Sequence, residues 1–312
     1  MQAVENHPDI KVDYKTLELI AVPEEMTRLA MLETGELDLV YGIMPHQLER
    51  IKNNPRIKIK KTDQYPSLIG VTGNMQQFPM MKDKNLRMAM QMGVNRKEIV
   101  DKVLMGEGYP LYQDASKIEM GYDPDFKIEF NPEKARKLLR ASNYEPGTPL
   151  TMSYDNTVPM AEVVAQIFQQ YMRDIGITIK PRRLEPAVRL SYTRNRDKRL
   201  GHMSLYSFAP GVDPYFRLML TIVSDGPYSP FPDRENQDQL DALCYNQARE
   251  PDEEKRLALL RKIQSLISLD PASVKLFGIY MIYAMRDHID YTWVPRAAMP
   301  AGLYNIKIVK EP

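Results

Sequence analysis

Residues 83–100, which read DKNLRMAMQMGVNRKEIV, constrain the fold of this chain more than any other stretch. Asp83 can accept hydrogen bonds from the first free N–H groups of a helix that begins beside it. Apolar or small residues then recur on one helical face, at positions 86, 89, 90 and 93. A second short helix is expected to begin at Asn95. The stretch therefore predicts a capped helix with one buried side.

Strand-like and helix-like segments alternate along the rest of the chain. The expected strands are residues 16–22, 37–40, 57–60, 67–73, 149–154, 177–180, 201–207, 274–285 and 304–309. The expected helices, besides those of residues 83–100, are residues 24–34, 45–53, 131–139, 161–175 and 253–269. Gly35 and Gly176 follow two of these helices at the position where glycine ends a helix. The alternation predicts a mixed α/β protein whose helices pack on sheets.

Composition excludes several classes of protein. The 312 residues carry a net charge of +1, so no global positive field attracts nucleic acid, and we expect no nucleic-acid partner. No apolar run reaches the length of a membrane-spanning helix. Cys244 lies on an apolar helical pattern and is expected to be a buried, unreactive thiol. Residues 1–6 lack the features of a signal peptide, so we expect a cytoplasmic protein or a mature or truncated piece.

No pattern for catalysis or metal binding emerges. The histidines at positions 7, 46, 202 and 288 are scattered and lack the spacing of a metal site. The sequence contains no G-x-S-x-G nucleophile motif, phosphate-binding loop or dinucleotide glycine motif. We therefore expect no enzymatic activity, no cofactor and no metal ligand, and a binding function becomes the leading hypothesis.

Six segments, in order along the chain, resemble motifs of the bacterial extracellular solute-binding proteins of family 5. These proteins are receptors for peptides, nickel chelates, opines and glutathione that feed ABC importers. The resembling segments are residues 29–40 (LAMLETGELDLV), 70–74 (GVTGN), 83–100, 122–125 with 131–139 (YDPD and NPEKARKLL), 174–177 (DIGI) and 254–269. The resemblance thus covers nearly the whole chain.

The resemblance implies a fold and a domain organisation. The fold is α/β, a two-lobed periplasmic binding protein-like fold of type II, cluster C, here incomplete at the N-terminus. Residues 1–67 would be a lobe I segment, residues 68–283 lobe II, the ligand-binding lobe, and residues 284–312 a return segment to lobe I. The lobe I strands would then lack some of their partners.

The same resemblance implies ligand-binding residues. Phe208 stands where the family has a tryptophan that walls the ligand, and Tyr206 should share its side of a strand. Tyr228 lies in a loop similar to a second ligand loop, and Asn74 ends a strand of lobe II. The alternatives are core packing for Phe208 and Tyr228 and a turn cap for Asn74. The loop has no aspartate between Phe208 and Asp213, so it looks more similar to that of nickel-chelate receptors than of peptide receptors.

The function implied is that of the substrate-binding component of an ABC importer. It would bind an oligopeptide or related compound, a metal chelate or an opine-like solute between two lobes by hinge closure. Its partners would be this ligand and the permease subunits, with membrane contact only through the permease or a lipid anchor outside this chain. It would be periplasmic, or extracellular and lipid-anchored. The alternative is a cytoplasmic ligand-sensing domain of a transcriptional regulator.

Overall fold

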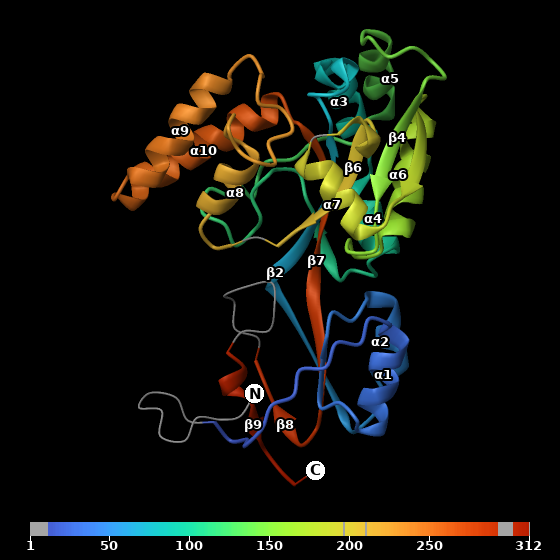
Figure 1. Cartoon of the computed structure of the whole chain (residues 1–312), viewed down its shortest axis with the longest axis vertical. Helices are drawn as coiled ribbons and strands as arrows, with labels where there is room; N and C mark the ends of the chain where they lie inside the picture. Colours follow the sequence, from blue (N-terminus) through green and yellow to red (C-terminus); the bar gives the residue numbers. More distant parts are fainter. Residues whose placement is uncertain (1–11, 196, 210, 293–301, 312) are drawn as a thin grey trace.

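Two parts of unequal size, joined by two long strands, make up the molecule (Figure 1). The computed structural model describes residues 12–195, 197–209, 211–292 and 302–311. The joining strands are β2 (Ile57–Gly73) and β7 (Ser273–Arg286), which pair antiparallel along most of their length. We call the part that carries α1 and α2 the lower part and the part that carries α3 to α10 the upper part.

The remaining strands lie on both sides of this central pair. They are β1 (Leu39–Tyr41), β3 (Gly108–Pro110), β4 (Pro149–Tyr154), β5 (Thr178–Arg183), β6 (Met203–Phe208), β8 (Ile289–Asp290) and β9 (Lys307–Ile308). The larger sheet has the order β1-β7-β2-β6-β4-β5, and β3 also pairs with β7. Its β4–β5 and β4–β6 pairs are parallel, and the others are antiparallel. A second sheet of β8 and β9 belongs to the lower part.

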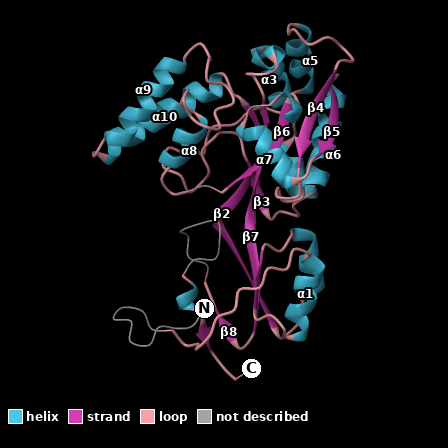
Figure 2. Ribbon diagram, viewed as in Figure 1, coloured by secondary structure: helices cyan, strands magenta, loops and turns pink. Residues whose placement is uncertain are grey.

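Helices cover the upper part of the sheet in two groups, which Figure 2 shows on opposite sides of the strands. The helices are α1 (Glu25–Thr34), α2 (Leu48–Ile51), α3 (Lys84–Met92), α4 (Arg96–Lys102), α5 (Pro132–Arg140), α6 (Ala161–Ile175), α7 (Pro186–Arg194), α8 (Tyr215–Thr221), α9 (Gln237–Arg249) and α10 (Glu253–Leu269). The helices α3 to α6 share the largest apolar core with the sheet. The helices α8 to α10 pack on one another around a separate core that includes Leu240, Cys244 and Ile263.

Local sequence explains where the best-predicted helices begin and end. The side chain of Asp83 accepts a hydrogen bond from the backbone N–H of Leu86 at 3.1 Å, so α3 is capped as expected. Asn95 caps α4 in the same way through the N–H of Glu98, at 3.2 Å. Gly176 ends α6 with a φ of 99°, a conformation that glycine adopts without strain.

Three expectations about strands need correction. Of residues 304–309, expected to form one strand, only 307–308 do so, as β9, because residues 303–305 form a turn of 3-10 helix. Residues 57–60 and 67–73 were expected to form two strands, but they belong to the single strand β2, because both pair with β7. No strand forms over residues 16–22, apart from a single bridge at Thr16. Leu19 and Ile20 there are more than half exposed, and a strand-like sequence becomes a strand only when a neighbouring backbone pairs with it. In the part of the chain that the structure describes, no helix is long and apolar enough to cross a membrane.

Candidate functional site

The hydroxyl of Tyr206 reaches across the sheet to a buried lysine. Tyr206 on β6 pairs with Gly70 on β2, which pairs with Lys275 on β7, so the three residues form one row. A Cβ atom on Gly70 would lie 2.8 Å from the Tyr206 hydroxyl and 3.0 Å from its ring, so only glycine leaves room for the ring here. The ammonium of Lys275 donates a hydrogen bond to the Tyr206 hydroxyl at 2.7 Å. The row therefore fixes the half-buried phenol on this face of the sheet.

Three further aromatic rings lie on the same face of the sheet, nearer the junction with the lower part. Phe208, opposite Leu68, is half-buried and packs with Tyr280 against a small core that contains Tyr109. The rings of Tyr109 and Tyr280 lie 6.2 Å apart, a normal spacing for interacting rings. We call the side chains of Tyr109, Tyr206, Phe208 and Tyr280 the aromatic face. The expectation that Phe208 and Tyr206 share one side of a strand agrees with this register.

Charged side chains are buried directly beneath Tyr206. Lys275 forms an ion pair with Asp114, and the Arg217 Nε atom on α8 lies 2.9 Å from a Glu119 oxygen. Burial alone would raise the pKa of Asp114, but the charges of Lys275 and Arg217 outweigh it and lower this pKa. The pKa of Lys275 is raised, because Asp114 and Tyr206 outweigh the opposite effect of burial. Asp114 and Lys275 are therefore both charged at neutral pH.

Asn74 directly follows the C-terminal end of β2, away from Phe208. Gly73, just before it, pairs with Met203 at the beginning of β6, whereas Phe208 ends that strand. The Asn74 amide donates to the carbonyl of Gly201 at 3.3 Å, and its backbone N–H donates to the carbonyl of His202 at 2.9 Å. These bonds fit the turn interpretation of Asn74, and the residue is not part of the aromatic face.

Tyr228 is also separate from the aromatic face. Its backbone N–H donates to the carbonyl of Leu220 at 2.9 Å, near the end of α8. The carbonyl of the next residue, Ser229, accepts a hydrogen bond from the side chain of Gln76 at 3.3 Å. These bonds connect Tyr228 to the Asn74 end of β2. Ligand contacts by Asn74 and Tyr228 remain predictions, and the structure does not bring either residue together with Phe208.

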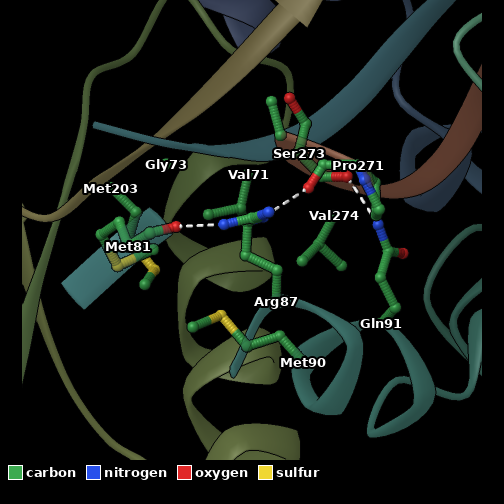
Figure 3. Close-up of a pocket in the computed structure, with 11 residues that line it drawn as sticks. Val71, Gly73, Met81, Arg87, Met90, Gln91, Met203, Pro271, Ser273 and Val274 are labelled. Carbon is green, nitrogen blue, oxygen red and sulfur yellow. Dashed lines mark hydrogen bonds between the residues drawn. The ribbon is translucent and has the colours of Figure 1, made fainter. Parts of the chain in front are cut away.

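An interior cavity behind β2 and β7 has a structural role. It measures about 10 Å³, room for about one water molecule, and lies between α3 and the sheet (Figure 3). The guanidinium of Arg87 donates to the carbonyls of Met81 at 2.7 Å and Pro271 at 3.0 Å, and Gln91 donates to the carbonyl of Ser273 at 2.6 Å. These bonds tie α3 to the segment that leads into β7, and the cavity is too small for a solute.

An open depression of about 410 Å³ lies beside α8. It is lined by Asp213, Tyr215, Phe216, Ala248, Glu250 and Arg256. Both guanidinium Nη atoms of Arg256 bind the carboxylate of Asp213 at 2.8 Å. The Asp213 carboxylate also accepts from the backbone N–H of Tyr215, the first residue of α8, at 2.8 Å. Asp213 therefore lies two residues before α8 and has structural partners within the chain. Among the described residues, no group of three or more His, Cys, Asp or Glu side chains could hold a metal ion.

Sequence reasoning missed the partners that the aromatic face requires. Lys275 and Asp114 are far apart in the chain, and neither belongs to a motif. One signal was present, because a lysine inside the apolar run at residues 274–285 is unusual and buried lysines need a charged partner. Tyr109 comes from β3, a strand of only three residues that the hydrophobic pattern does not reveal.

The sequence profile of the bacterial extracellular solute-binding proteins, family 5 (middle region), matches residues 4–226. The chain is 26% identical over 180 residues to di/tripeptide-binding protein 1 of Pseudomonas aeruginosa (strain UCBPP-PA14), over 55% of this chain and 32% of that protein. It is 28% identical over 159 residues to the glutathione-binding protein GsiB of Escherichia coli (strain K12), over 50% of this chain and 30% of GsiB.

Solved structures share the fold. The periplasmic binding protein DppA of Helicobacter pylori, in complex with the peptide STSA, superimposes with a TM-score of 0.85 at 19% identity. That match covers 99% of this chain and 60% of DppA. NikA of Brucella suis, in complex with Fe(III)-EDTA, gives a TM-score of 0.81 at 18% identity, over 96% of this chain and 63% of NikA. The chain thus matches about a third of the length of the curated relatives and less than two thirds of the solved ones.

Proposed function

Because the chain belongs to the bacterial extracellular solute-binding proteins of family 5, we propose that it binds a small solute for an ABC importer. The solute would be an oligopeptide or related compound, a metal chelate or an opine-like molecule. The curated relatives are named for di/tripeptides and glutathione, and the solved ones were captured with a peptide and with a metal chelate. Binding of a small solute is common to these proteins, while the class of solute differs between them.

The aromatic face is the observation that carries this proposal. Its four rings lie on one side of the sheet, next to the segment where β2 and β7 leave the upper part for the lower part. Solute sites are concave and mostly apolar or aromatic, with few fixed polar groups, and such sites occur preferentially between domains. A solute on Phe208 and Tyr206 would lie within reach of both parts, so closure around it would follow from binding.

The two parts would then act as lobes. Lobe I would comprise residues 1–67 and 284–312, and lobe II residues 68–283, with β2 and β7 as the connecting strands. The bound, closed form would be the state that permease subunits recognise, in the periplasm or at the cell surface. The function needs no covalent chemistry. The relatives described above are binding proteins, and nothing in them supports the alternative of a cytoplasmic sensing domain of a regulator.

Titration calorimetry of the chain with dipeptides, tripeptides, glutathione and nickel–histidine tests the proposal. At least one of these should bind, and Phe208→Ala should weaken that binding by roughly 1–3 kcal/mol through loss of an aromatic contact. Phe216→Ala is the matched control, because Phe216 is two-thirds exposed and lies on α8, away from the sheet.

Each outcome decides between sites. Weakened binding in Phe208→Ala with normal binding in Phe216→Ala supports the aromatic face. The reverse pattern would move the solute to the depression beside α8. Absence of heat with every solute would contradict solute binding by this chain.

A further inference from the structure

The charges beneath the aromatic face do not balance. Three buried cations, Arg217, Arg234 and Lys275, surround Asp114. Glu119 pairs with Arg217, and Asp270, which acts on Arg234, also pairs with Arg87. Arg217, Arg234, Lys275 and Glu119 are each at most 7% exposed. With Arg87 and Asp270 included, four positive side chains face three negative ones, a surplus of one positive charge. A buried surplus charge is unfavourable unless another group of opposite sign approaches it.

Unpaired hydrogen-bond donors also indicate that the buried cations lack acceptor groups. Both Nη atoms of Arg217 and one Nη atom of Arg234 are buried and make no hydrogen bond among the described residues. Buried donors of this kind almost always have a partner, which can be water, an ion or a ligand. The group that is short of partners is thus positively charged and rich in donors, and an anion is the ligand that such a group favours.

Tyr206 connects this group to the surface. Its hydroxyl oxygen accepts from Lys275, so its own O–H hydrogen is available to another acceptor. The ring is half-buried, whereas Arg217 and Lys275 beneath it are buried. A solute on the aromatic face would therefore meet an O–H donor placed above an excess of positive charge. A carboxylate oxygen suits this position better than a neutral carbonyl oxygen, because charged acceptors form stronger hydrogen bonds.

We propose that Tyr206 binds a carboxylate group of the solute. The negative charge of this group compensates the positive surplus of the buried cluster formed by Asp114, Glu119, Asp270, Arg87, Arg217, Arg234 and Lys275. This inference rests on the proposed function, since it assumes that the solute lies on the aromatic face. It narrows the solute class to molecules with a free carboxylate near an apolar group. Lys275 acts as a positioning residue, because it orients the phenol without touching the solute.

Two small probes that differ only in charge test the inference. N-acetylglycine carries a carboxylate, and N-acetylglycinamide carries an amide of nearly the same shape. Chemical-shift titration should show that the acid binds about tenfold more tightly than the amide, the ratio expected for a charge-assisted hydrogen bond. Tyr206→Phe should reduce this preference nearly to one while leaving the melting temperature close to that of the original chain.

Tyr245→Phe is the control. It removes an exposed hydroxyl on α9 that donates a hydrogen bond to Asp225 at 2.9 Å. It should leave the preference for the acid unchanged. Replacing chloride by gluconate at constant ionic strength distinguishes a solute carboxylate from an inorganic ion. If chloride, and not gluconate, competes with N-acetylglycine for binding, and this competition is the same in Tyr206→Phe, a free anion occupies the cluster and the proposal is wrong.

Equal binding of the two probes, absence of binding by both, or an unchanged preference in Tyr206→Phe would each overturn the inference. None of these outcomes depends on which peptide or chelate the chain takes. Conversely, binding of a peptide that is sensitive to Phe208→Ala but indifferent to Tyr206→Phe would support the proposed function and reject the carboxylate contact.

Discussion

At the scale of single residues, the molecule depends on a glycine that makes room for a side chain from a neighbouring strand. Gly70 lies between Tyr206 and Lys275, and the absence of a side chain lets the phenol lie across β2. A similar arrangement occurs at Gly278, where a Cβ atom would lie 2.5 Å from the ring of Tyr109. Two glycines thus create the surface on which two members of the aromatic face lie.

Gly70→Ala should destabilise the fold and displace Tyr206. A Cβ atom 2.8 Å from the hydroxyl and 3.0 Å from the ring cannot be accommodated unless the ring moves. Overpacking of this kind typically lowers the free energy of unfolding by about 1–3 kcal/mol. Chemical denaturation measures the loss. The same substitution in a Tyr206→Ala background should cost much less, because the clash is gone. Equal losses in both backgrounds would show that Gly70 is needed for a reason other than Tyr206.

Cys244 should be chemically silent in the folded protein. The residue is fully buried between α9 and its neighbours, and burial raises the pKa of its thiol to about 12. At pH 8 almost no thiolate is present, and the thiolate is the reactive form. A thiol reagent such as DTNB should release its chromophore only after denaturant is added. Rapid reaction in buffer alone would show that α9 and α10 separate readily.

At the scale of elements, a buried carboxylate joins three segments of the upper part. Asp155, just after β4, lies 2.5 Å from the Nε atom of Arg189 on α7 and also accepts from Thr157. Arg189 in turn donates to the hydroxyl of Ser204 on β6, at 3.2 Å. The helix α7 has no buried residue of its own, so this polar connection, more than apolar packing, holds it to the sheet.

The connection through Asp155 should make stability depend on pH in the acid range. Burial alone would raise the pKa of Asp155, but the hydrogen bonds from Arg189 and Thr157 lower it below its usual value. A carboxylate whose pKa is lower in the folded state contributes stability above its unfolded pKa, near 3.9, and the contribution is lost as pH falls further. The free energy of unfolding should therefore decrease below about pH 4.

Asp155→Asn should weaken this decrease, since asparagine does not titrate but still accepts hydrogen bonds. Asp125→Asn, at an exposed loop position, should leave the pH profile as it is. Denaturant titrations between pH 3 and neutrality, about the range in which Asp changes charge, measure all three profiles. If the free energy of unfolding decreases with the same slope in acid for the original chain and for Asp155→Asn, the Asp155 carboxylate does not cause that decrease.

At the scale of the whole molecule, stability is unevenly distributed. The upper part has a core shared by the sheet and α3 to α6, whereas the lower part has two small cores. The lower part also exposes Leu19, Ile20 and Met26 by at least half. Regions with few buried apolar contacts open first, because local opening there costs less free energy than global unfolding.

Hydrogen exchange should therefore be faster in the lower part. Peptides from α1 and β1 should take up deuterium well before peptides from β4 and α6, when exchange is followed by mass spectrometry. Peptides from β2 and β7, which run through both parts, should show protection that increases toward the upper part. Uniform protection over the whole chain would mean that the two parts unfold as one cooperative unit.

The sequence alone determined the features that depend on neighbours within a few residues. The caps of α3 and α4, the glycine end of α6 and the exact bounds of α10 follow from local hydrogen bonds and helical periodicity. Phe208 and Tyr206 were also accessible, because alternation along one strand places both on one face.

Only the tertiary structure decided which distant residues meet. The register of β2 between β6 and β7 brings Gly70, Tyr206 and Lys275 into one row, and a loop then supplies Asp114. Residues 16–22 have a strand-like sequence but form no strand, since strand formation requires a partner backbone. Asn74 and Phe208 lie at opposite ends of one strand pair for the same physical reason. Pairing between strands is non-local, and local propensity does not carry the information about which strands will pair.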